Sequence, residues 1–350
     1  MTATIAPQKP PRDMLFPAIV ENMRDGVLAF DKNGNLITAN HPVCEMLGFD
    51  DPSQLAGTFA EMVLMRDELW EINEAIVDSM YAANNVVTRD VTFRIGREER
   101  HVVVRTSMLR DEGSGQPLGV VVILSDVSEK MRSLRERIEF GHLVVLFIGL
   151  LGLANIVTLF VQTYDWFNVY STGFAWAYLI LITLPVAFTV WHLKLAPSQI
   201  GLTVKGWRRA VIEGAAASVI AIAVIYALSH LLHDDTVPGE QAAMSTMSVG
   251  MVILSRCGYA LHSLIQEVMA RGVLQTSLRR LLDDQSGVRS LLVASLIFGL
   301  FHSHFGLMAV AVTAVSGVVM GALYMRHGNL IGVTILHVAA GIAAFQLGIL

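Results

Sequence analysis

Two kinds of hydrophobic pattern divide the chain near residue 140. Before this point apolar and polar residues alternate in short runs, and after it long apolar segments follow one another. Alternation over four to eight residues is typical of half-buried strands, whereas a helix needs about 20 mainly apolar residues to cross a bilayer. The pattern therefore predicts a folded N-terminal domain followed by a membrane domain.

The N-terminal part has the pattern of two strands, a few short helices and three more strands. The first two strands come from GVLAFDKNGNLITAN, where Asn33-Gly34 supplies a hairpin turn. The other three are the β-rich runs VVTRDVTFRI, RHVVVRTSML and LGVVVILSDVS, with polar, Gly-containing turns between them. This order predicts an α+β domain with a five-stranded antiparallel sheet and helices on one face.

That order, opened by ENMRDGVLAFDKNGNLITAN and closed by VVILSDVSE, resembles a PAS domain over residues 14–128. A generic α+β domain is the alternative, and residues 1–13 are expected to be disordered. PAS domains often bind small molecules, but the sequence identifies no ligand here. Cys44 lies in HPVCEML, which differs from the Asn-Cys-Arg run of flavin-adduct light sensors and argues against that photochemistry. His41 and His101 could ligate haem, although a lone histidine is more often a surface or structural residue.

A helix is expected to join the two halves over residues 126–141. Asp126 and Glu129 have the spacing of a capping box at a helix start. The 4-3-4-3 spacing of a coiled-coil core is then followed by Val127, Met131, Leu134, Ile138 and Gly141. We expect a signalling helix that pairs in a homodimer. A single amphipathic linker helix is the alternative, because two heptads are short.

Residues 142–350 are expected to form an all-α polytopic membrane bundle of about seven spans. The apolar segments lie near 142–162, 173–193, 210–232, 245–266, 290–304, 306–325 and 330–349. Lys and Arg gather in alternate loops, whereas QTYDWFNVYST and HDDTVPGE contain neither. By the positive-inside rule, this predicts a cell-membrane protein with a cytoplasmic PAS domain and an extracytoplasmic C-terminus.

Composition agrees with this division and argues against several functional classes. Charged residues make up 16% of the chain, against about 25% in soluble proteins. The net charge of -5, without Lys/Arg-rich runs, gives no sign of nucleic-acid binding. The two cysteines, Cys44 and Cys257, cannot form a disulfide framework or a cysteine-based metal site. No apolar stretch of signal-peptide length opens the sequence, so the first domain is expected to stay in the cytoplasm.

Polar and ionisable residues inside the predicted spans are the main functional candidates, because burying them in lipid is costly. The set comprises Arg256, His262, Gln266, Glu267, Arg271, His302, His304 and His337. On a helix, His262 and Gln266 share one face, while Glu267 and Arg271 share a neighbouring one. A structural Glu267–Arg271 ion pair with hydrogen-bonded packing histidines is one explanation. Their concentration on three spans favours a shared site.

Three short motifs in this region are similar to those of the CAAX-prenyl-protease and bacteriocin-processing (CPBP) family of intramembrane endopeptidases. QEVMARG resembles its EExxxRG motif, and SLIFGLFHSHFG matches its FxxxH motif through Phe298 and His302. GNLIGVTILHVAAG matches its closing HxxxN motif at His337. With the upstream IGLTVKGWRRAVIEG, the resemblance covers about residues 195–345.

The resemblance implies a glutamate that activates water for attack on a peptide carbonyl, with histidines and an asparagine that orient groups and stabilise the oxyanion. The family motifs are matched by Glu267, Arg271, His302 and His337. Gln266 stands where the resemblance implies the base, and Gly341 where it implies the asparagine. An amide has no useful basicity, and glycine offers no side-chain donor where one can be worth about 3–4 kcal/mol. Participation of a divalent metal stays open.

Three functional hypotheses follow. The first is a PAS-regulated intramembrane endopeptidase that acts on a peptide or prenylated protein, with Glu267 or His262 as substitute base. The second is a non-catalytic pseudoprotease that binds a membrane partner or peptide under PAS control. The third is an unrelated polytopic receptor or transporter. Kinase output is not expected, since no nucleotide-binding segment follows the PAS region.

Overall fold

The computed structural model describes residues 12–49, 67–81, 86–232 and 248–347. Within it the chain divides into two compact units, Met1–Arg135 and Glu136–Leu350, which we describe separately. Residues 1–11, most of the segment expected to be disordered, lie outside the described part.

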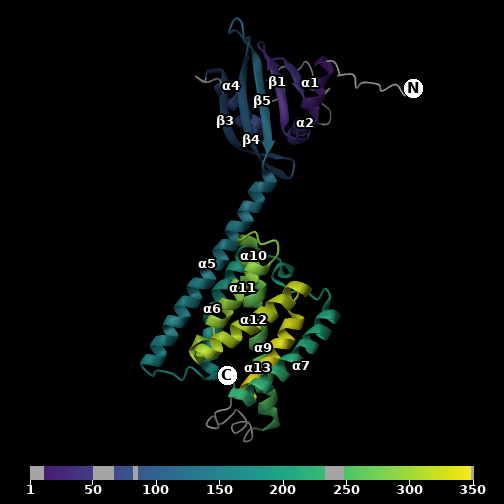
Figure 1. The fold of residues 1–350 in the computed structure, drawn as a ribbon. Helices are drawn as coiled ribbons and strands as arrows, with labels where there is room; N and C mark the ends of the chain where they lie inside the picture. Colours follow the sequence, from purple (N-terminus) through teal and green to yellow (C-terminus); the bar gives the residue numbers. More distant parts are fainter. Residues whose placement is uncertain (1–11, 50–66, 82–85, 233–247, 348–350) are drawn as a thin grey trace, which may run out of the picture. The chain divides into compact units, whose positions relative to one another are not determined.

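The first unit is built on a five-stranded antiparallel sheet in the order β2-β1-β5-β4-β3 (Figure 1). Its strands are β1 Gly26–Asp31, β2 Leu36–Ala39, β3 Val86–Ile95, β4 Glu98–Arg110 and β5 Pro117–Asp126. The Asn33-Gly34 turn forms as expected, with Gly34 at φ 85° and Asp31 accepting hydrogen bonds from the backbone N–H groups of Asn33 and Asn35. The predicted five-stranded antiparallel sheet is confirmed.

Short helices cover the apolar side of this sheet. They are α2 His41–Leu47, η2 Asp67–Leu69 and α4 Trp70–Tyr81, and a further helix, α1 Arg12–Glu21, precedes the sheet in the chain. Side chains from α2 and α4, including Val43, Leu47 and Ile72, form one buried cluster with strand residues such as Val104 and Leu124. Period-2 alternation along the strands thus places one set of apolar residues in a common core.

The buried side chain of Asn40 ties together the start of the sheet and of α2. Its Oδ1 accepts hydrogen bonds from the backbone N–H groups of Val27 (2.8 Å) and Val43 (3.2 Å). Its Nδ2 donates to the carbonyl oxygens of Val20 and Asp25, each at 2.9 Å. Asn40 caps α2 through its Oδ1. Both the oxygen and the nitrogen of its amide are therefore hydrogen-bonded.

The second unit is a helical bundle that begins within a long helix, α5. The bundle helices are α5 Ser128–Thr163, α6 Thr172–His192, α7 Trp207–Leu232, α9 Val249–Glu267, α10 Thr276–Leu281, α11 Val288–Leu300, α12 Leu307–His327 and α13 Ile331–Gln346. The helix starts at Ser128, close to the expected start, and the Asp126 carboxylate accepts a hydrogen bond from the Ser128 N–H at 2.8 Å, two residues on, instead of the Glu129 N–H that a capping box would use.

Four helices of the described part are long and apolar enough to cross a membrane: Ser128–Thr163, Thr172–His192, Trp207–His230 and Leu307–His327. Two more apolar helices, α11 and α13, have only 13 and 16 residues, short of the roughly 20 needed for a full crossing. A membrane bundle is thus supported, but the expected number of about seven spans is not confirmed.

Two local departures from regular α-helix occur where the candidate residues lie. Residues Val268–Gln275, directly after α9, form a π-helix, η4, a feature frequent at functional sites. The span expected over 290–304 ends as a helix at Leu300. A short 3-10 turn, Ser303–Phe305, follows and stops at Gly306, whose φ is 100°. His302 and His304 therefore lie beyond the helix rather than on its last turn.

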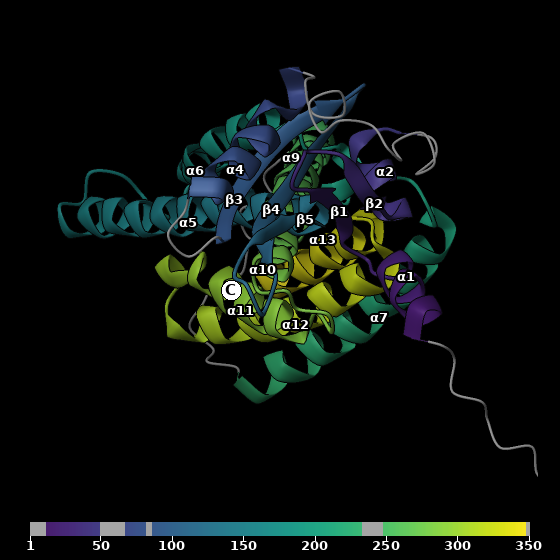
Figure 2. The ribbon, with the colours of Figure 1, turned by 90° about the horizontal axis from the view of Figure 1, so that it is seen from above.

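Helices α7 and α13 lie side by side and touch backbone to backbone (Figures 1 and 2). A Cβ at Gly332 would lie 2.4 Å from the Ala210 carbonyl oxygen, and one at Gly214 would lie 2.5 Å from the Gly332 carbonyl oxygen. Small residues at helix contacts are typical of membrane bundles, because they let backbones approach closely. This contact fixes the position of α13, the helix that carries His337.

Candidate functional site

A buried acid–base cluster joins α9 and its π-helical extension to α13. The Oε1 of Glu267 lies 2.7 Å from Nδ1 of His337, and the Oε2 of Glu267 lies 3.3 Å from Nε of Arg271. Glu267 and Arg271 have no exposed surface, and His337 is also buried. The expected Glu267–Arg271 pairing is present, and the structure adds His337, 70 residues away in sequence, as the partner of the other carboxylate oxygen.

Phe298 on α11 connects the arginine and both motif histidines. The Arg271 guanidinium lies over the Phe298 ring, 4.7 Å from its centre. The same ring makes edge contacts with His302 at 5.1 Å and His337 at 5.8 Å between centroids. A cation over a desolvated aromatic face is favourable, so Phe298 offsets part of the cost of burying Arg271. The arginine and both histidines of the matched motifs thus meet around one ring.

His302 reaches this cluster from the turn after α11. Its Nδ1 lies 3.1 Å from the carbonyl oxygen of Phe298, one helical turn earlier. If Nδ1 donates this bond, Nε2 is the nitrogen left as an acceptor. His304, two residues later, instead contacts the rings of Phe174 and Tyr178 on α6. The structure therefore places His302 in the cluster and His304 in an aromatic contact with α6.

Several buried polar atoms of the cluster have no hydrogen-bond partner within the described residues. They are Oγ of Ser263, Oε2 of Glu267, and Nε, Nη1 and Nη2 of Arg271. The close approach of Oε2 and Nε is an ion pair without hydrogen-bond alignment. Leaving such groups unpaired in an apolar interior costs free energy. Buried polar groups in folded proteins are usually paired, so these atoms make the cluster a candidate for binding a ligand or water.

Neither of the two residues considered as substitute bases, Glu267 and His262, is placed as a base that accepts a proton from water would be. Both oxygens of Glu267 are engaged by His337 and Arg271. The ring of His262 turns toward α6, where its Nε2 lies 3.4 Å from the Ala175 carbonyl oxygen and its ring packs edge-on against Trp176. Gln266 is half-buried. The position expected to hold the base thus has an amide, and neither neighbour is free to replace it.

Gly341 lies one turn after His337 on α13, and a tyrosine side chain occupies the volume that a side chain at position 341 would fill. A Cβ at 341 would lie 1.7 Å from the Tyr259 hydroxyl oxygen and 2.8 Å from its Cζ. Tyr259, on α9, is half-buried, and its ring packs edge-on against Phe345 of α13. The position where the resemblance implies an asparagine therefore faces a tyrosine hydroxyl from the neighbouring helix.

The described residues contain no group of three or more His, Cys, Asp or Glu side chains arranged to hold a metal ion. Around Glu267 the only close imidazole among the described residues is His337, and Arg271 supplies a positive charge that disfavours a cation there. The cluster therefore does not fit a divalent metal, and we derive no step through one.

The histidines considered as haem ligands lie in the first unit with surface partners. His41 lies 3.3 Å from Glu45, and both side chains are exposed. The Nδ1 of His101 lies 2.9 Å from the Thr92 hydroxyl, and its Nε2 lies 3.6 Å from Glu99.

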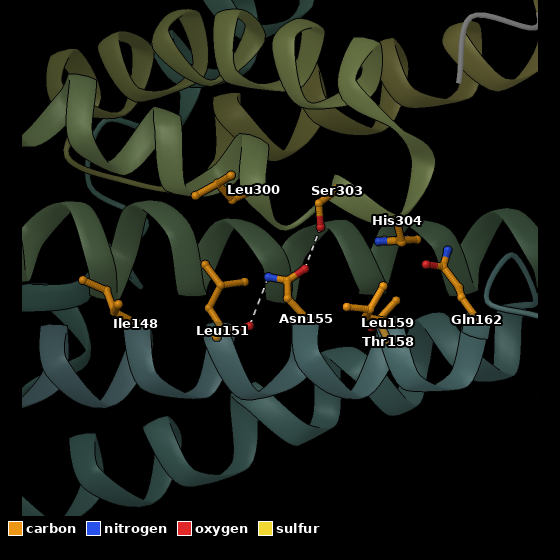
Figure 3. Close-up of a pocket in the computed structure, with 10 residues that line it drawn as sticks. Ile148, Leu151, Asn155, Thr158, Leu159, Gln162, Leu300, Ser303 and His304 are labelled. Carbon is orange, nitrogen blue, oxygen red and sulfur yellow. Dashed lines mark hydrogen bonds between the residues drawn. The ribbon is translucent and has the colours of Figure 1, made fainter. Parts of the chain in front are cut away.

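A separate cavity of about 490 Å³ lies between α5 and the end of α11 (Figure 3). Polar groups line part of it, and the Ser303 hydroxyl donates a 2.6 Å hydrogen bond to Oδ1 of Asn155. Further lining residues are Ile148, Leu151, Thr158, Leu159, Gln162, Leu300 and His304. Glu267, Arg271 and His337 do not line it, so this cavity and the acid–base cluster are distinct features of the bundle.

The sequence analysis did not single out Tyr259, Ser263 or Asn155. A signal for the first two exists, because Tyr259, Ser263 and Glu267 are spaced four apart and so share one face of α9. Asn155 is a polar residue within an apolar span, which by itself marks a position worth testing.

Comparisons with known proteins find a family match in each half of the chain. Residues 15–127 match the family model of the PAS fold, and residues 248–343 match the model described as Type II CAAX prenyl endopeptidase Rce1-like. The chain therefore combines a PAS domain with an Rce1-like domain of the CAAX protease family. Both predicted resemblances are confirmed, the second over a shorter range than 195–345.

Solved structures similar to this chain include two bacterial PAS domains. One is from Colwellia psychrerythraea, with 13% identity, a TM-score of 0.29, and coverage of 34% of this chain and 99% of that one. The other is the PAS domain of Bordetella pertussis BvgS, with 19% identity, a TM-score of 0.30, and coverage of 36% and 93%. Among curated proteins, none matches this chain.

Proposed function

We propose that this protein is a PAS-regulated membrane protein whose Rce1-like bundle binds a membrane-associated peptide, without hydrolysing it as a glutamate-dependent endopeptidase would. The observation that carries the proposal is the engagement of both Glu267 oxygens next to an amide at Gln266. A general base must accept a proton from water. Here the amide cannot, and the neighbouring carboxylate is held by an arginine and a histidine.

Peptide binding is favoured because the buried polar cluster is present although Gln266 replaces the base that the resemblance implies. The buried donors of Arg271 and Ser263 have no hydrogen-bond partner among the described residues, so they are available for hydrogen bonds to a ligand. A peptide segment within a bilayer has the complementary need, since its carbonyls lack partners wherever it is not helical. The Rce1-like match over 248–343 favours a peptide ligand over the unrelated receptor or transporter considered above.

The proposed route of control runs through α5. Met131, Leu134 and Ile138 lie at coiled-coil spacing and are 42%, 48% and 51% exposed, which suits pairing with α5 of a second copy. Within the second unit, Arg137 pairs with Asp283 and Glu136 with Arg280, both in the segment that follows the π-helix. A change in α5 would thereby reach α10 and the π-helix that carries Arg271. This scheme includes the cytoplasmic PAS domain and the multi-span topology expected from the loop charges.

The test uses the full-length protein in nanodiscs with a panel of peptides and prenylated peptides. We expect the protein to bind a subset of them, measured by fluorescence anisotropy, with no cleavage product by mass spectrometry. His337→Ala should abolish binding, whereas the control His192→Ala should not. Restoring the expected groups in Gln266→Glu/Gly341→Asn/Tyr259→Ala should produce cleavage. Tyr259 is shortened in this variant because its hydroxyl occupies the volume that an asparagine side chain at position 341 would need.

A second candidate, slow hydrolysis, is favoured by one specific contact. In the 2.7 Å Glu267–His337 contact, a carboxylate that accepts from Nδ1–H would orient the imidazole and leave Nε2 as a base, as in carboxylate–histidine pairs of hydrolases. Cleavage by the unmodified protein that disappears in both His337→Ala and Glu267→Gln would establish this candidate and contradict the first.

A further inference from the structure

The cavity beside α5 is an elongated groove that follows one face of this helix (Figure 3). Its lining residues on α5 recur at steps of three and four residues: Ile148, Leu151, Gly152, Asn155, Thr158, Leu159 and Gln162. Ile148 and Gln162 are 14 residues apart, which corresponds to about 21 Å along a helix. The groove therefore extends over about four turns of α5.

The wall of the groove is mostly apolar. Ile148 and Leu159 are 47% and 64% exposed, although α5 is one of the helices long and apolar enough to cross a membrane. The polar groups midway are already paired, because Ser303 donates to Asn155, and Nδ2 of Asn155 donates to the Leu151 carbonyl oxygen at 3.0 Å. Since the bilayer core contains no water, such a wall suits a hydrocarbon chain.

One end of the groove is polar and lies where α5 ends. Gln162 is exposed and comes one residue before the last residue of the helix, Thr163. The segment that follows carries four aromatic residues that are all more than half exposed, Tyr164, Trp166, Phe167 and Tyr170. Tyrosine and tryptophan are enriched at the boundary between membrane and water, so this segment marks the level at which α5 leaves the hydrocarbon.

The length of the groove agrees with this placement. One leaflet measures about 15 Å of hydrocarbon, or about 20–22 Å when its head groups are included. The groove extends about 21 Å along α5 from its polar end at Gln162. A single lipid molecule of that leaflet therefore has the length to occupy it.

We propose that the groove binds one phospholipid of the bilayer, with an acyl chain along α5 and its head group at Gln162. The Gln162 amide can donate a hydrogen bond to an ester or phosphate oxygen. Between residues 143 and 193, Asp165 is the only Asp, Glu, Lys or Arg, so this segment offers no cation to a net negative head group. A zwitterionic head group, whose ammonium can approach Asp165, is the better match.

This site is separate from the acid–base cluster and does not depend on the proposed peptide binding. It involves α5, which lies outside the Rce1-like match over 248–343.

Gly152 provides a direct way to close the groove. A Cβ at Gly152 would meet no atom of the described residues within 4 Å outside its own helix backbone, and the same holds for Gly149. Both glycines lie on α5, but only Gly152 lines the groove. Leucine favours helix more than glycine does, so Gly152→Leu should fill the groove without destabilising α5. Gly149→Leu is the matched control.

The first measurement is native mass spectrometry of the full-length protein in detergent, with added phosphatidylethanolamine or phosphatidylglycerol of identical acyl chains. We expect one phosphatidylethanolamine per protein copy and weaker binding of phosphatidylglycerol. Gly152→Leu should weaken binding about tenfold or more, because its side chain displaces several methylene groups of the lipid. Gly149→Leu should bind like the unmodified protein, and Asp165→Asn should reduce the preference between the two head groups.

The second measurement maps the position of the chain in nanodiscs. A phosphatidylethanolamine with a photoreactive diazirine in its acyl chain is cross-linked to the full-length protein, and labelled peptides are identified by mass spectrometry. We expect label concentrated in residues 148–162 and 300–304, and lost from both in Gly152→Leu.

Equal lipid binding by Gly152→Leu and Gly149→Leu would overturn the proposal. Label spread evenly over the exposed faces of α6 and α7 would overturn it too, since that pattern is general contact with the bilayer. Displacement of the lipid by a prenylated peptide would assign the groove to a different apolar chain, and tighter binding of phosphatidylglycerol would contradict the assigned head group. None of these results bears on peptide binding at the acid–base cluster.

Discussion

The two units of this protein bury polar side chains in different ways. In the PAS domain, the Asn40 amide makes four hydrogen bonds to backbone groups and has no exposed surface. In the bundle, Glu267, Arg271 and Ser263 are equally buried, yet five of their polar atoms have no hydrogen-bond partner among the described residues. Most buried polar groups in folded proteins are paired. The difference separates a polar residue whose hydrogen bonds build the fold from polar residues that the fold leaves without hydrogen-bond partners, as the proposed ligand binding requires.

The largest effect is expected from breaking the buried ion pair. Glu267→Leu would leave Arg271 buried without its counter-ion, which typically costs about 3–5 kcal/mol. The double variant Glu267→Leu/Arg271→Met should recover most of this stability, because no buried charge remains, while peptide binding stays lost. Unfolding of the full-length protein in detergent measures both. A single variant as stable as the unmodified protein would contradict the burial of an effective ion pair.

A smaller effect is expected for Asn40→Ala in the PAS domain. Its removal leaves buried backbone N–H groups at Val27 and Val43 unpaired and removes the cap of α2, at a cost of about 2–3 kcal/mol. Hydrogen–deuterium exchange of residues 26–31 in the full-length protein should accelerate. The control Asn22→Ala removes an exposed side-chain bond and should leave exchange unchanged. Equal exchange in both variants would mean that Asn40 does not hold the sheet.

Asp284 sharpens the comparison, because it is a buried polar residue of the second unit that is fully paired. Its carboxylate accepts from the Ser290 N–H, the Gly287 N–H and the Ser286 and Ser290 hydroxyls, which stabilise the charged form. These bonds, led by that from the Ser290 backbone, lower the pKa of Asp284 to about 2. A buried carboxylate in this bundle can thus be fully paired, unlike the Glu267 cluster, whose Ser263, Glu267 and Arg271 atoms lack hydrogen-bond partners among the described residues.

The effect of Asp284 should be confined to acid. Because its folded-state pKa is lowered, its stabilising contribution is fully present above the unfolded pKa of about 4. It is lost as the pH falls through about 2. Exchange of residues 284–290 should therefore accelerate between about pH 4 and pH 2, and Asp284→Asn should remove most of this pH dependence. The exposed Asp283→Asn is the control. An unaltered profile in Asp284→Asn would assign the acid response to another group.

Local patterns were enough to predict the sheet. The run VVTRDVTFRI corresponds to β3 residue for residue, and the Asn33-Gly34 turn is where the sequence places it. Period-2 alternation and turn chemistry are properties of neighbouring residues, and they survive folding unchanged. The strand order β2-β1-β5-β4-β3 depends on pairing between distant segments, and no local pattern specifies it.

The sequence was enough to predict which residues belong to the candidate site, but not which of them contact each other across helices. Motif spacing identified Glu267 and Arg271 as partners because they are four apart on one helix. The contact of Glu267 with His337 depends on how α9 and α13 pack, and the contact of Tyr259 with Gly341 depends on the same packing. The π-helix over Val268–Gln275 was not predicted either. Its apolar and polar residues are compatible with an ordinary α-helix.

The backbone contact between α7 and α13 implies a constraint on how this sequence can change over generations. Carbon and oxygen atoms in contact lie about 3.3 Å apart or more, so a methyl group at Gly332, 2.4 Å from the Ala210 oxygen, would push the helices apart. His337 is five residues further along the same helix, and such a shift would break its 2.7 Å contact with Glu267. The glycines at 214 and 332 do not belong to the candidate site. Related sequences that retain the site should nevertheless retain glycine at both positions.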